Sequence, residues 1–149
     1  MRNLSTPSAI MISPKLFSKS GDFTRHAYDP KKAKALMTEA GYGDGFEVGM
    51  DCPNNRYVND EQICIAVAGM LSKIGVTVKL LAQPKALYFK KVLGPAYNTS
   101  FYLLGWTPGS FDSWNVLNNL INCQQEGGRG KFNLGNYCAP GTDKLTDQI

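Results

Sequence analysis

The residues best suited to bind a ligand lie in two short polar stretches, and each follows an apolar run. Arg56 and Tyr57 come shortly after the run that ends at Cys52, and a guanidinium group can bind a carboxylate through two parallel hydrogen bonds. Trp106 ends the run "FYLLGW", and an indole ring offers a flat apolar surface with one N–H donor. These side chains could bind a small molecule, but they do not form a recognisable catalytic group.

Arg56 and Trp106 also have purely structural interpretations. Arg56 could form an ion pair with Asp60 or Glu61, two acidic residues that the dipole at a helix N-terminus favours. Trp106 could cover the edge of its own domain. Both alternatives stay open from the sequence, whereas Trp114, on the helix that follows, is predicted to lie in the core.

Signatures of catalysis are weak. The only histidine, His26, is far from any serine or cysteine at a strand-to-helix turn, so no catalytic triad is indicated. The stretch "GYGDG" follows a helix and not a strand, which excludes a dinucleotide fingerprint. The later "GGRG" is typical of a flexible loop. We therefore predict a protein that is not an enzyme and that uses no cofactor and no metal.

Four cysteines, Cys52, Cys64, Cys123 and Cys138, allow three disulfide pairings. Their spacing lacks the C-x-x-C pairs of zinc sites. Two local bridges, 52–64 and 123–138, are the simplest oxidised arrangement. Four reduced thiols that act as small buried apolar groups are the alternative. A small α/β thiol enzyme is the competing function, and pairing of all four cysteines would exclude it.

Composition indicates one ordinary globular domain. The 149 residues suffice for a buried core, and 43% of them are hydrophobic. The net charge of +4 comes from short lysine clusters, so we predict no nucleic-acid partner. No stretch reaches the roughly 20 apolar residues of a membrane helix. The N-terminus does not resemble a signal peptide, so a location outside the cytoplasm would imply a longer chain.

Periodicity predicts strands that alternate with helices. Helices are expected at 29–41, 59–75, 84–93 and 111–122, and strands at 46–52, 76–82 and 99–106. This order favours an α/β fold with a mostly parallel sheet flanked by helices. Ligands of such sheets bind beyond the carboxyl ends of the strands, which is where Arg56, Tyr57 and Trp106 are predicted to lie.

Side chains at the helix starts predict where the helices begin. Asp29 is expected to cap the first helix, with Pro30 at its first position. Asn59 and Gln62 have the spacing of a capping box. Either Ser110 or Asp112 is expected to cap the helix that carries Trp114, and Thr142 to cap a last helix that stops after about two turns.

These elements in this order resemble a known family. The segments "YDPKKAKALMTEAGYGDGFEVGMDCPNNRYVNDEQICIAVAGMLSKIGVTVKL", "YFKKV", "YLLGW" and "GNYCAPGTDKLTDQI" are similar to extracytoplasmic solute-binding proteins of the peptide, oligopeptide and nickel class. Such proteins serve ATP-driven importers. The resemblance implies one of two α/β lobes that close on a solute, and a closed form that docks on a membrane permease.

The resemblance also implies how the chain is organised. Residues 1–27 are expected to form an irregular lead-in from the neighbouring lobe or a linker. Residues 28–149 are expected to form a fragment of the C-terminal lobe that is truncated within a helix. The protein would be periplasmic, its solute a peptide or peptide-like molecule, and the isolated fragment is expected to dimerise through apolar surface left uncovered.

The implied binding wall consists of Trp106, Thr107, Pro108, Gly109, Ser110 and Asp112, with Arg56 and Tyr57 nearby. In peptide binders of this family, an acidic residue shortly after Gly-Trp can hold the amino terminus of the peptide. Gly109 occupies that place here, and Asp112 could take the role after a shift of the loop. The departure leaves open a modified peptide, or a glutathione-like or haem-like solute.

Overall fold

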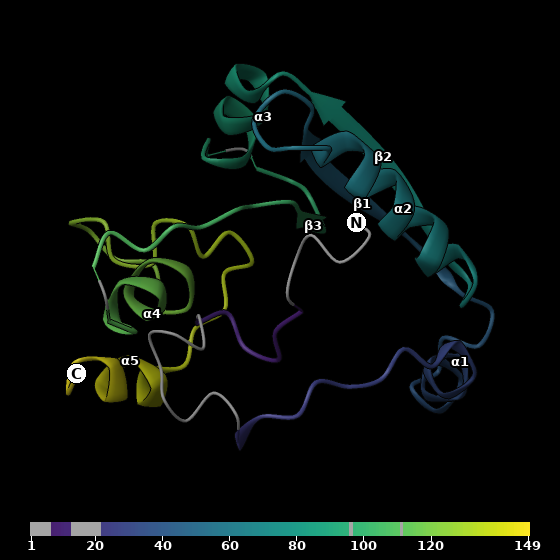
Figure 1. Ribbon diagram of the computed structural model, residues 1–149, viewed down its shortest axis with the longest axis horizontal. Helices are drawn as coiled ribbons and strands as arrows, with labels where there is room; N and C mark the ends of the chain where they lie inside the picture. Colours follow the sequence, from purple (N-terminus) through teal and green to yellow (C-terminus); the bar gives the residue numbers. More distant parts are fainter. Residues whose placement is uncertain (1–6, 13–21, 96, 111) are drawn as a thin grey trace. The chain divides into compact units, whose positions relative to one another are not determined.

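The computed structural model describes residues 7–12, 22–95, 97–110 and 112–149. The chain divides into two compact units, which are taken in turn below. One unit is Tyr28–Gly105, and the other combines Met1–Ala27 with Trp106–Ile149. Figure 1 shows both, with the sheet in the blue-to-green part of the chain.

A parallel sheet is the centre of the Tyr28–Gly105 unit. Its strands are β1 (Phe46–Pro53), β2 (Val76–Gln83) and β3 (Phe101–Tyr102), and they lie in the order β2-β1-β3. Both β2 and β3 run parallel to β1. The α/β class predicted from the sequence is therefore confirmed.

Three helices accompany this sheet. They are α1 (Pro30–Glu39), α2 (Asp60–Ser72) and α3 (Lys85–Val92), and α2 lies along the sheet in Figure 1. The core on the α2 side contains Met50, Cys52 and Cys64, with Val67, Val78, Leu80, Phe101 and Leu103 packed around them. Alternate residues of a strand point to opposite faces, so Asp51 faces away from α2, and Lys91 of α3 reaches it there.

The described residues of the second unit form two short helices and a glycine-rich loop. The helices are α4 (Trp114–Leu120) and α5 (Pro140–Thr146), and a disulfide between Cys123 and Cys138 closes the loop that joins them. Arg129 anchors this loop to α5, since its Nη1 lies 2.7 Å from the Asp147 carboxylate and its Nη2 donates to the carbonyl oxygen of Asp143. The sequence did not predict this anchor for the "GGRG" stretch.

Helix starts follow the prediction in part. The Asp29 side chain accepts a hydrogen bond from the Lys32 N–H at 2.9 Å, so the predicted first cap is confirmed. The capping box at Asn59 is wrong, because Asn59 has a left-handed backbone (φ 56°) and its side chain makes no capping bond. Thr142 is also wrong as a cap, since it lies inside α5.

The strand predicted at 99–106 is much shorter in the structure, because β3 pairs only at Phe101–Tyr102. Side chains take the next carbonyl groups: Tyr88 donates to Leu103 O at 2.7 Å, and Tyr57 donates to Gly105 O at 3.3 Å. Pro53, the last residue of β1, has no N–H to donate to the ladder at this end. Among the described residues, no helix is both long and apolar enough to span a membrane.

Candidate functional site

The predicted binding residues fall into two groups, one in each unit. Trp106, Thr107, Pro108, Gly109, Ser110 and Asp112 follow one another at the start of the second unit, just before α4. Arg56 and Tyr57 lie on the loop between β1 and α2 in the Tyr28–Gly105 unit. The structure thus brings together the members of each group.

Trp106 is half-buried and contacts two other side chains, Asn115 and Phe132. Its indole Nε1 donates to Asn115 Oδ1 at 3.0 Å. Its ring lies 5.0 Å from the ring of Phe132, measured between centroids, with a 60° angle between the planes. This is a normal tilted geometry for an aromatic pair. The single N–H donor is therefore used inside the protein, and the ring surface is what Trp106 can offer a ligand.

The loop after Trp106 is open at Gly109. Gly109 is exposed, and a Cβ placed there would lie 3.7 Å from Asn115 Nδ2, which is an ordinary contact distance. The backbone therefore has room for a side chain at this position. The lack of an acidic group at residue 109 is a property of the sequence and is not imposed by the fold.

Asp112 binds the first turn of α4 through its side chain. Its Oδ1 accepts hydrogen bonds from the Ser110 hydroxyl at 3.1 Å and from the Asn115 N–H at 3.2 Å. The N-cap of α4 is Ser113, whose side chain makes no capping bond. The prediction of Ser110 or Asp112 at this position is therefore wrong, although the Asp112 side chain binds an N–H of the first turn. The prediction for Trp114 is wrong, because 42% of its surface is exposed.

Tyr57 packs directly on the glycine that precedes Trp106. A Cβ at Gly105 would come within 2.8 Å of Tyr57 Cε1, and the Tyr57 hydroxyl bonds to the Gly105 carbonyl. Only glycine allows this close approach of ring and backbone. Tyr57 therefore fixes the end of the β3 segment that leads into the Trp106 loop.

Arg56 points along Tyr57 and away from the acidic residues. The guanidinium carbon lies 5.0 Å from the centroid of the Tyr57 ring, within the range of a cation–π contact. Within the described part of the chain, the guanidinium forms no ion pair with Asp60 or Glu61. Arg56 is exposed, so its charge is available to an anionic group of a ligand.

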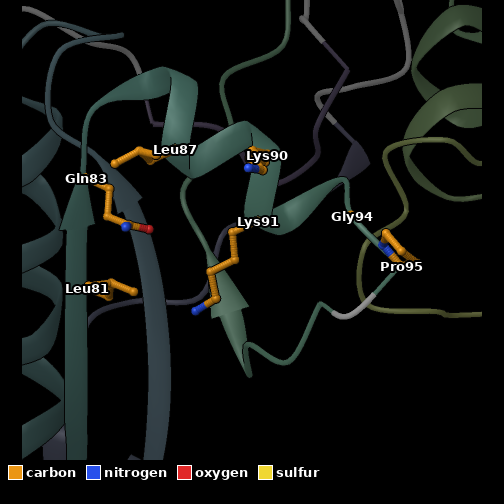
Figure 2. A pocket seen from close by; sticks show the side chains of 7 residues that line it. All are labelled: Leu81, Gln83, Leu87, Lys90, Lys91, Gly94 and Pro95. Carbon is orange, nitrogen blue, oxygen red and sulfur yellow. The ribbon is translucent and has the colours of Figure 1, made fainter.

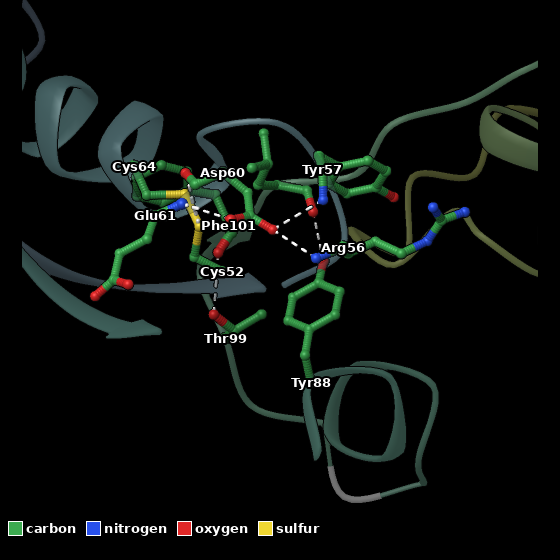
Figure 3. The surroundings of a disulfide bond; sticks show 10 residues. Cys52, Arg56, Tyr57, Asp60, Glu61, Cys64, Tyr88, Thr99 and Phe101 are labelled. Atoms are coloured by element: carbon green, nitrogen blue, oxygen red, sulfur yellow. Dashed lines mark hydrogen bonds between the residues drawn. A yellow bond between two sulfur atoms is a disulfide. The ribbon is translucent and has the colours of Figure 1, made fainter. Parts of the chain in front are cut away.

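Asp60 organises the backbone of this loop. Its Oδ2 accepts the N–H groups of Arg56 and Tyr57 at 2.9 and 3.0 Å, and its Oδ1 accepts that of Glu61 at 3.0 Å (Figure 3). Burial by itself would raise the pKa of Asp60, but these N–H donors stabilise the carboxylate and bring its pKa below the ordinary value. Asp60 replaces the predicted capping box as the group that secures the start of α2.

Asp60→Asn is expected to cost about 1–2 kcal/mol of stability at pH 7, because an amide oxygen accepts weaker hydrogen bonds than a carboxylate. A lowered folded-state pKa stabilises the protein above the unfolded-state value of about 4, and that stabilisation is lost as the pH falls through the folded-state pKa. Urea unfolding at several pH values measures both effects. Glu61→Gln is the control, and an equal loss in the control would contradict the role of Asp60.

All four cysteines are paired as predicted, Cys52 with Cys64 and Cys123 with Cys138. The first bridge is completely buried beside β1 and α2 (Figure 3). Since no cysteine is free, the thiol enzyme considered from the sequence is not favoured. Among the described residues, no group of three or more His, Cys, Asp and Glu side chains is arranged to hold a metal ion.

A concave surface of about 380 Å³ lies between β2 and α3, which sequence reasoning did not identify (Figure 2). It is lined by Leu81, Gln83, Leu87, Lys90, Lys91, Gly94 and Pro95. The Lys91 ammonium is bound to Asp51. Gln83 Oε1 is buried without a hydrogen-bond partner among the described residues.

Two residues of the Trp106 site were missed by sequence reasoning. Asn115 and Phe132 contact Trp106 directly, yet neither stands in a motif. Asn115 is one of several asparagines on α4, and Phe132 follows the glycine-rich stretch. For Asn115, the sequence offered only its place in the helix that follows Trp106. For Phe132, no sequence pattern indicated a contact with Trp106.

Comparisons with known proteins agree with this architecture. The di/tripeptide-binding protein 1 of Pseudomonas aeruginosa (strain UCBPP-PA14) is 30% identical over 121 residues, which are 79% of this chain and 22% of that protein. The dipeptide-binding protein of Escherichia coli (strain K12) is 28% identical over 116 residues, which are 76% of this chain and 21% of that protein. The chain thus spans about a fifth of the length of these relatives.

A solved structure has the same fold. The ABC transporter-associated periplasmic binding protein DppA of Helicobacter pylori, in complex with the peptide STSA, matches with a TM-score of 0.78 and 23% identity. The match covers 95% of this chain and 27% of that one. The model of the bacterial extracellular solute-binding proteins, family 5 Middle, matches residues 1–128, most of the sequence. The chain therefore belongs to the bacterial extracellular solute-binding proteins of family 5.

Proposed function

We propose that this chain forms one wall of the solute-binding cleft of a periplasmic protein that captures peptides or peptide-like solutes for ATP-driven import. The family match over residues 1–128 carries the proposal. Two relatives bear the names of dipeptide- and di/tripeptide-binding proteins, which favours a peptide. The protein binds and releases its solute unchanged.

Two contact regions are proposed, one in each unit: the Trp106 ring with the loop to Asp112, and, separately, Arg56 with Tyr57. Support comes from the exposure of these groups: Trp106 is half-buried and Gly109 is exposed, while Arg56 lacks an ion pair among the described residues. A second wall closing on them would desolvate the polar groups of the solute and strengthen each contact.

Partners follow from this role. The solute-loaded protein docks on the permease of an ABC importer, and no contact with nucleic acid is expected at a net charge of +4 without a basic run. When produced alone, the chain is also expected to associate with a second copy through exposed apolar side chains such as Leu87, which is 53% exposed.

Calorimetric titration of the complete gene product tests the function. The peptides Leu-Leu and STSA are the primary probes, and glutathione and haem are the alternatives. Saturable binding of a peptide, with no measurable binding of glutathione or haem, supports the proposal. Binding of glutathione or haem in place of both peptides would replace it with a non-peptide solute, and absence of any binding would overturn it.

Gly109→Asp is expected to increase affinity for free-amine peptides on the order of tenfold, because a carboxylate there can bind an ammonium group through a charge-assisted hydrogen bond. The open space around Gly109 admits the side chain. Titration with Leu-Leu and N-acetyl-Leu-Leu measures the effect, and only the free-amine peptide should gain. Gly109→Asn is the uncharged control. Equal gains for both peptides would contradict an amine-specific site.

A further inference from the structure

The segment closed by the Cys123–Cys138 disulfide brings Phe132 to the ring of Trp106. We propose that Phe132 is a second ligand-contact residue, which selects apolar side chains of the solute, and that this disulfide positions it. The inference rests on the proposed function, because it concerns the same wall. It assigns a specificity role to a segment that sequence patterns mark only as a loop.

Phe132 is held by the backbone of α4. Its N–H donates to Asn119 O at 3.0 Å, and the N–H of Gly130 donates to Asn118 O at 2.8 Å. Asn133, next in sequence, is 4% exposed, and its side-chain Nδ2 donates to the carbonyl oxygens of Asn122 and Tyr137. The place of Phe132 is therefore fixed by several bonds and does not depend on ring packing alone.

Trp106 is hydrogen-bonded to the same helix, α4, near its N-terminus. Its indole binds Asn115 in the first turn of α4, and Asn119 Nδ2 donates to Asn115 O at 2.7 Å. Thus α4 sets the separation between the two aromatic residues. A helix is a stiff spacer, so the 5.0 Å contact between their rings is a built arrangement.

The chemistry of the pair indicates what it would bind. Both rings are half-buried, so each keeps part of its surface exposed. The Trp106 N–H is already used by Asn115, and the ammonium of the adjacent Lys131 lies 5.9 Å from the Phe132 centroid. Two adjoining aromatic surfaces favour an apolar side chain of a peptide.

The two disulfides differ in accessibility. Cys52 and Cys64 are 0% exposed, whereas Cys123 is 8% exposed and Cys138 lies at the surface. A reductant therefore reaches the 123–138 bridge first. Opening this bridge frees one end of the segment that carries Phe132, and the contact with Trp106 is expected to loosen.

Titration of the complete gene product with Leu-Leu and STSA tests the specificity role. Phe132→Leu is expected to weaken Leu-Leu binding on the order of tenfold and to change STSA binding by less than about threefold. Phe132→Tyr, which keeps the ring, should retain Leu-Leu binding. Phe89→Leu is the matched control, since Phe89 also lies 5.0 Å from another ring, that of Tyr88.

The outcomes separate this inference from the proposed function. A wild-type protein that binds both peptides, with Phe132→Leu equal to wild type for both, overturns the role of Phe132 and leaves the function intact. A wild-type protein that binds neither peptide overturns both. An equal loss for both peptides in Phe132→Leu contradicts selection of apolar side chains.

Tryptophan fluorescence tests the positioning role without a ligand. In a Trp114→Phe variant of the 149-residue chain, Trp106 is the only tryptophan. Paired replacement of Cys123 and Cys138 by serine is expected to shift Trp106 emission to longer wavelength and to increase its quenching by acrylamide. The same paired replacement in the complete gene product should lose Leu-Leu affinity as Phe132→Leu does. Unchanged emission, quenching and affinity would overturn the role of the disulfide.

Discussion

Lys91→Met is expected to destabilise the protein by about 3 kcal/mol, because it leaves a buried carboxylate without its counter-charge. Asp51 is 1% exposed and lies in the middle of the sheet, and the Lys91 ammonium contacts both of its oxygens at 2.8 and 2.9 Å. The Lys91 side chain is 31% exposed, so water partly screens the pair, and the lower end of the range for buried pairs applies. Urea unfolding followed by circular dichroism measures the loss.

Lys90→Met is the matched control for this variant. Lys90 is the preceding residue on α3, is exposed, and forms no ion pair with any described residue. Its replacement should change stability by less than about 0.5 kcal/mol. Combining Lys91→Met with Asp51→Asn should recover part of the loss, since the buried group is then neutral. A double variant as unstable as Lys91→Met alone would show that charge is not the cause.

The pair also illustrates what sequence can and cannot predict. The alternation of "FEVGMDC" places Asp51 on the face opposite Met50 and Cys52, so its direction was available from the pattern. Its counter-charge was not, because Lys91 lies 40 residues away and is one of two adjacent lysines on α3. Choosing between Lys90 and Lys91 requires the rotation of α3 over the sheet, which only packing determines.

The order of the elements in the Tyr28–Gly105 unit could be predicted because it depends on local signals. Asp29 and Pro30 mark the start of α1, and the β1 and β2 sequences place apolar residues at alternate positions. The length of β3 could not be predicted. Beyond this strand, backbone carbonyls accept hydrogen bonds from the hydroxyls of Tyr57 and Tyr88, which come from other parts of the unit.

The candidate site was predictable to a similar extent. Trp106 stood out because a tryptophan at the end of an apolar run is unusual for a buried strand. Its partners came from places that periodicity does not connect, namely the first turn of α4 for Asn115 and a disulfide-closed loop for Phe132. Spacing identifies a residue with suitable chemistry, but the groups that orient it are set by tertiary contacts.

Gly130→Ala is expected to destabilise the protein by about 3 kcal/mol. This value combines the cost of a left-handed backbone at alanine with the cost of a steric clash of the new Cβ. Gly130 has a φ of +64°, and a Cβ there would lie 2.4 Å from Asn122 O and 2.7 Å from Cys123 O. Both neighbours are backbone atoms, so neither can rotate away. Thermal unfolding and Trp106 fluorescence in the Trp114→Phe background measure the effect.

Gly127→Ala separates the two costs. Gly127 has a φ of +85°, but no atom lies within 4 Å of its Cβ position, so only the left-handed cost of about 1–2 kcal/mol is expected. Since the Gly130 N–H bonds to α4 two residues before Phe132, only Gly130→Ala should also shift Trp106 emission. Equal losses in the two variants would mean that the approach to Asn122 and Cys123 does not constrain the loop, and that α4 alone holds Phe132 against Trp106.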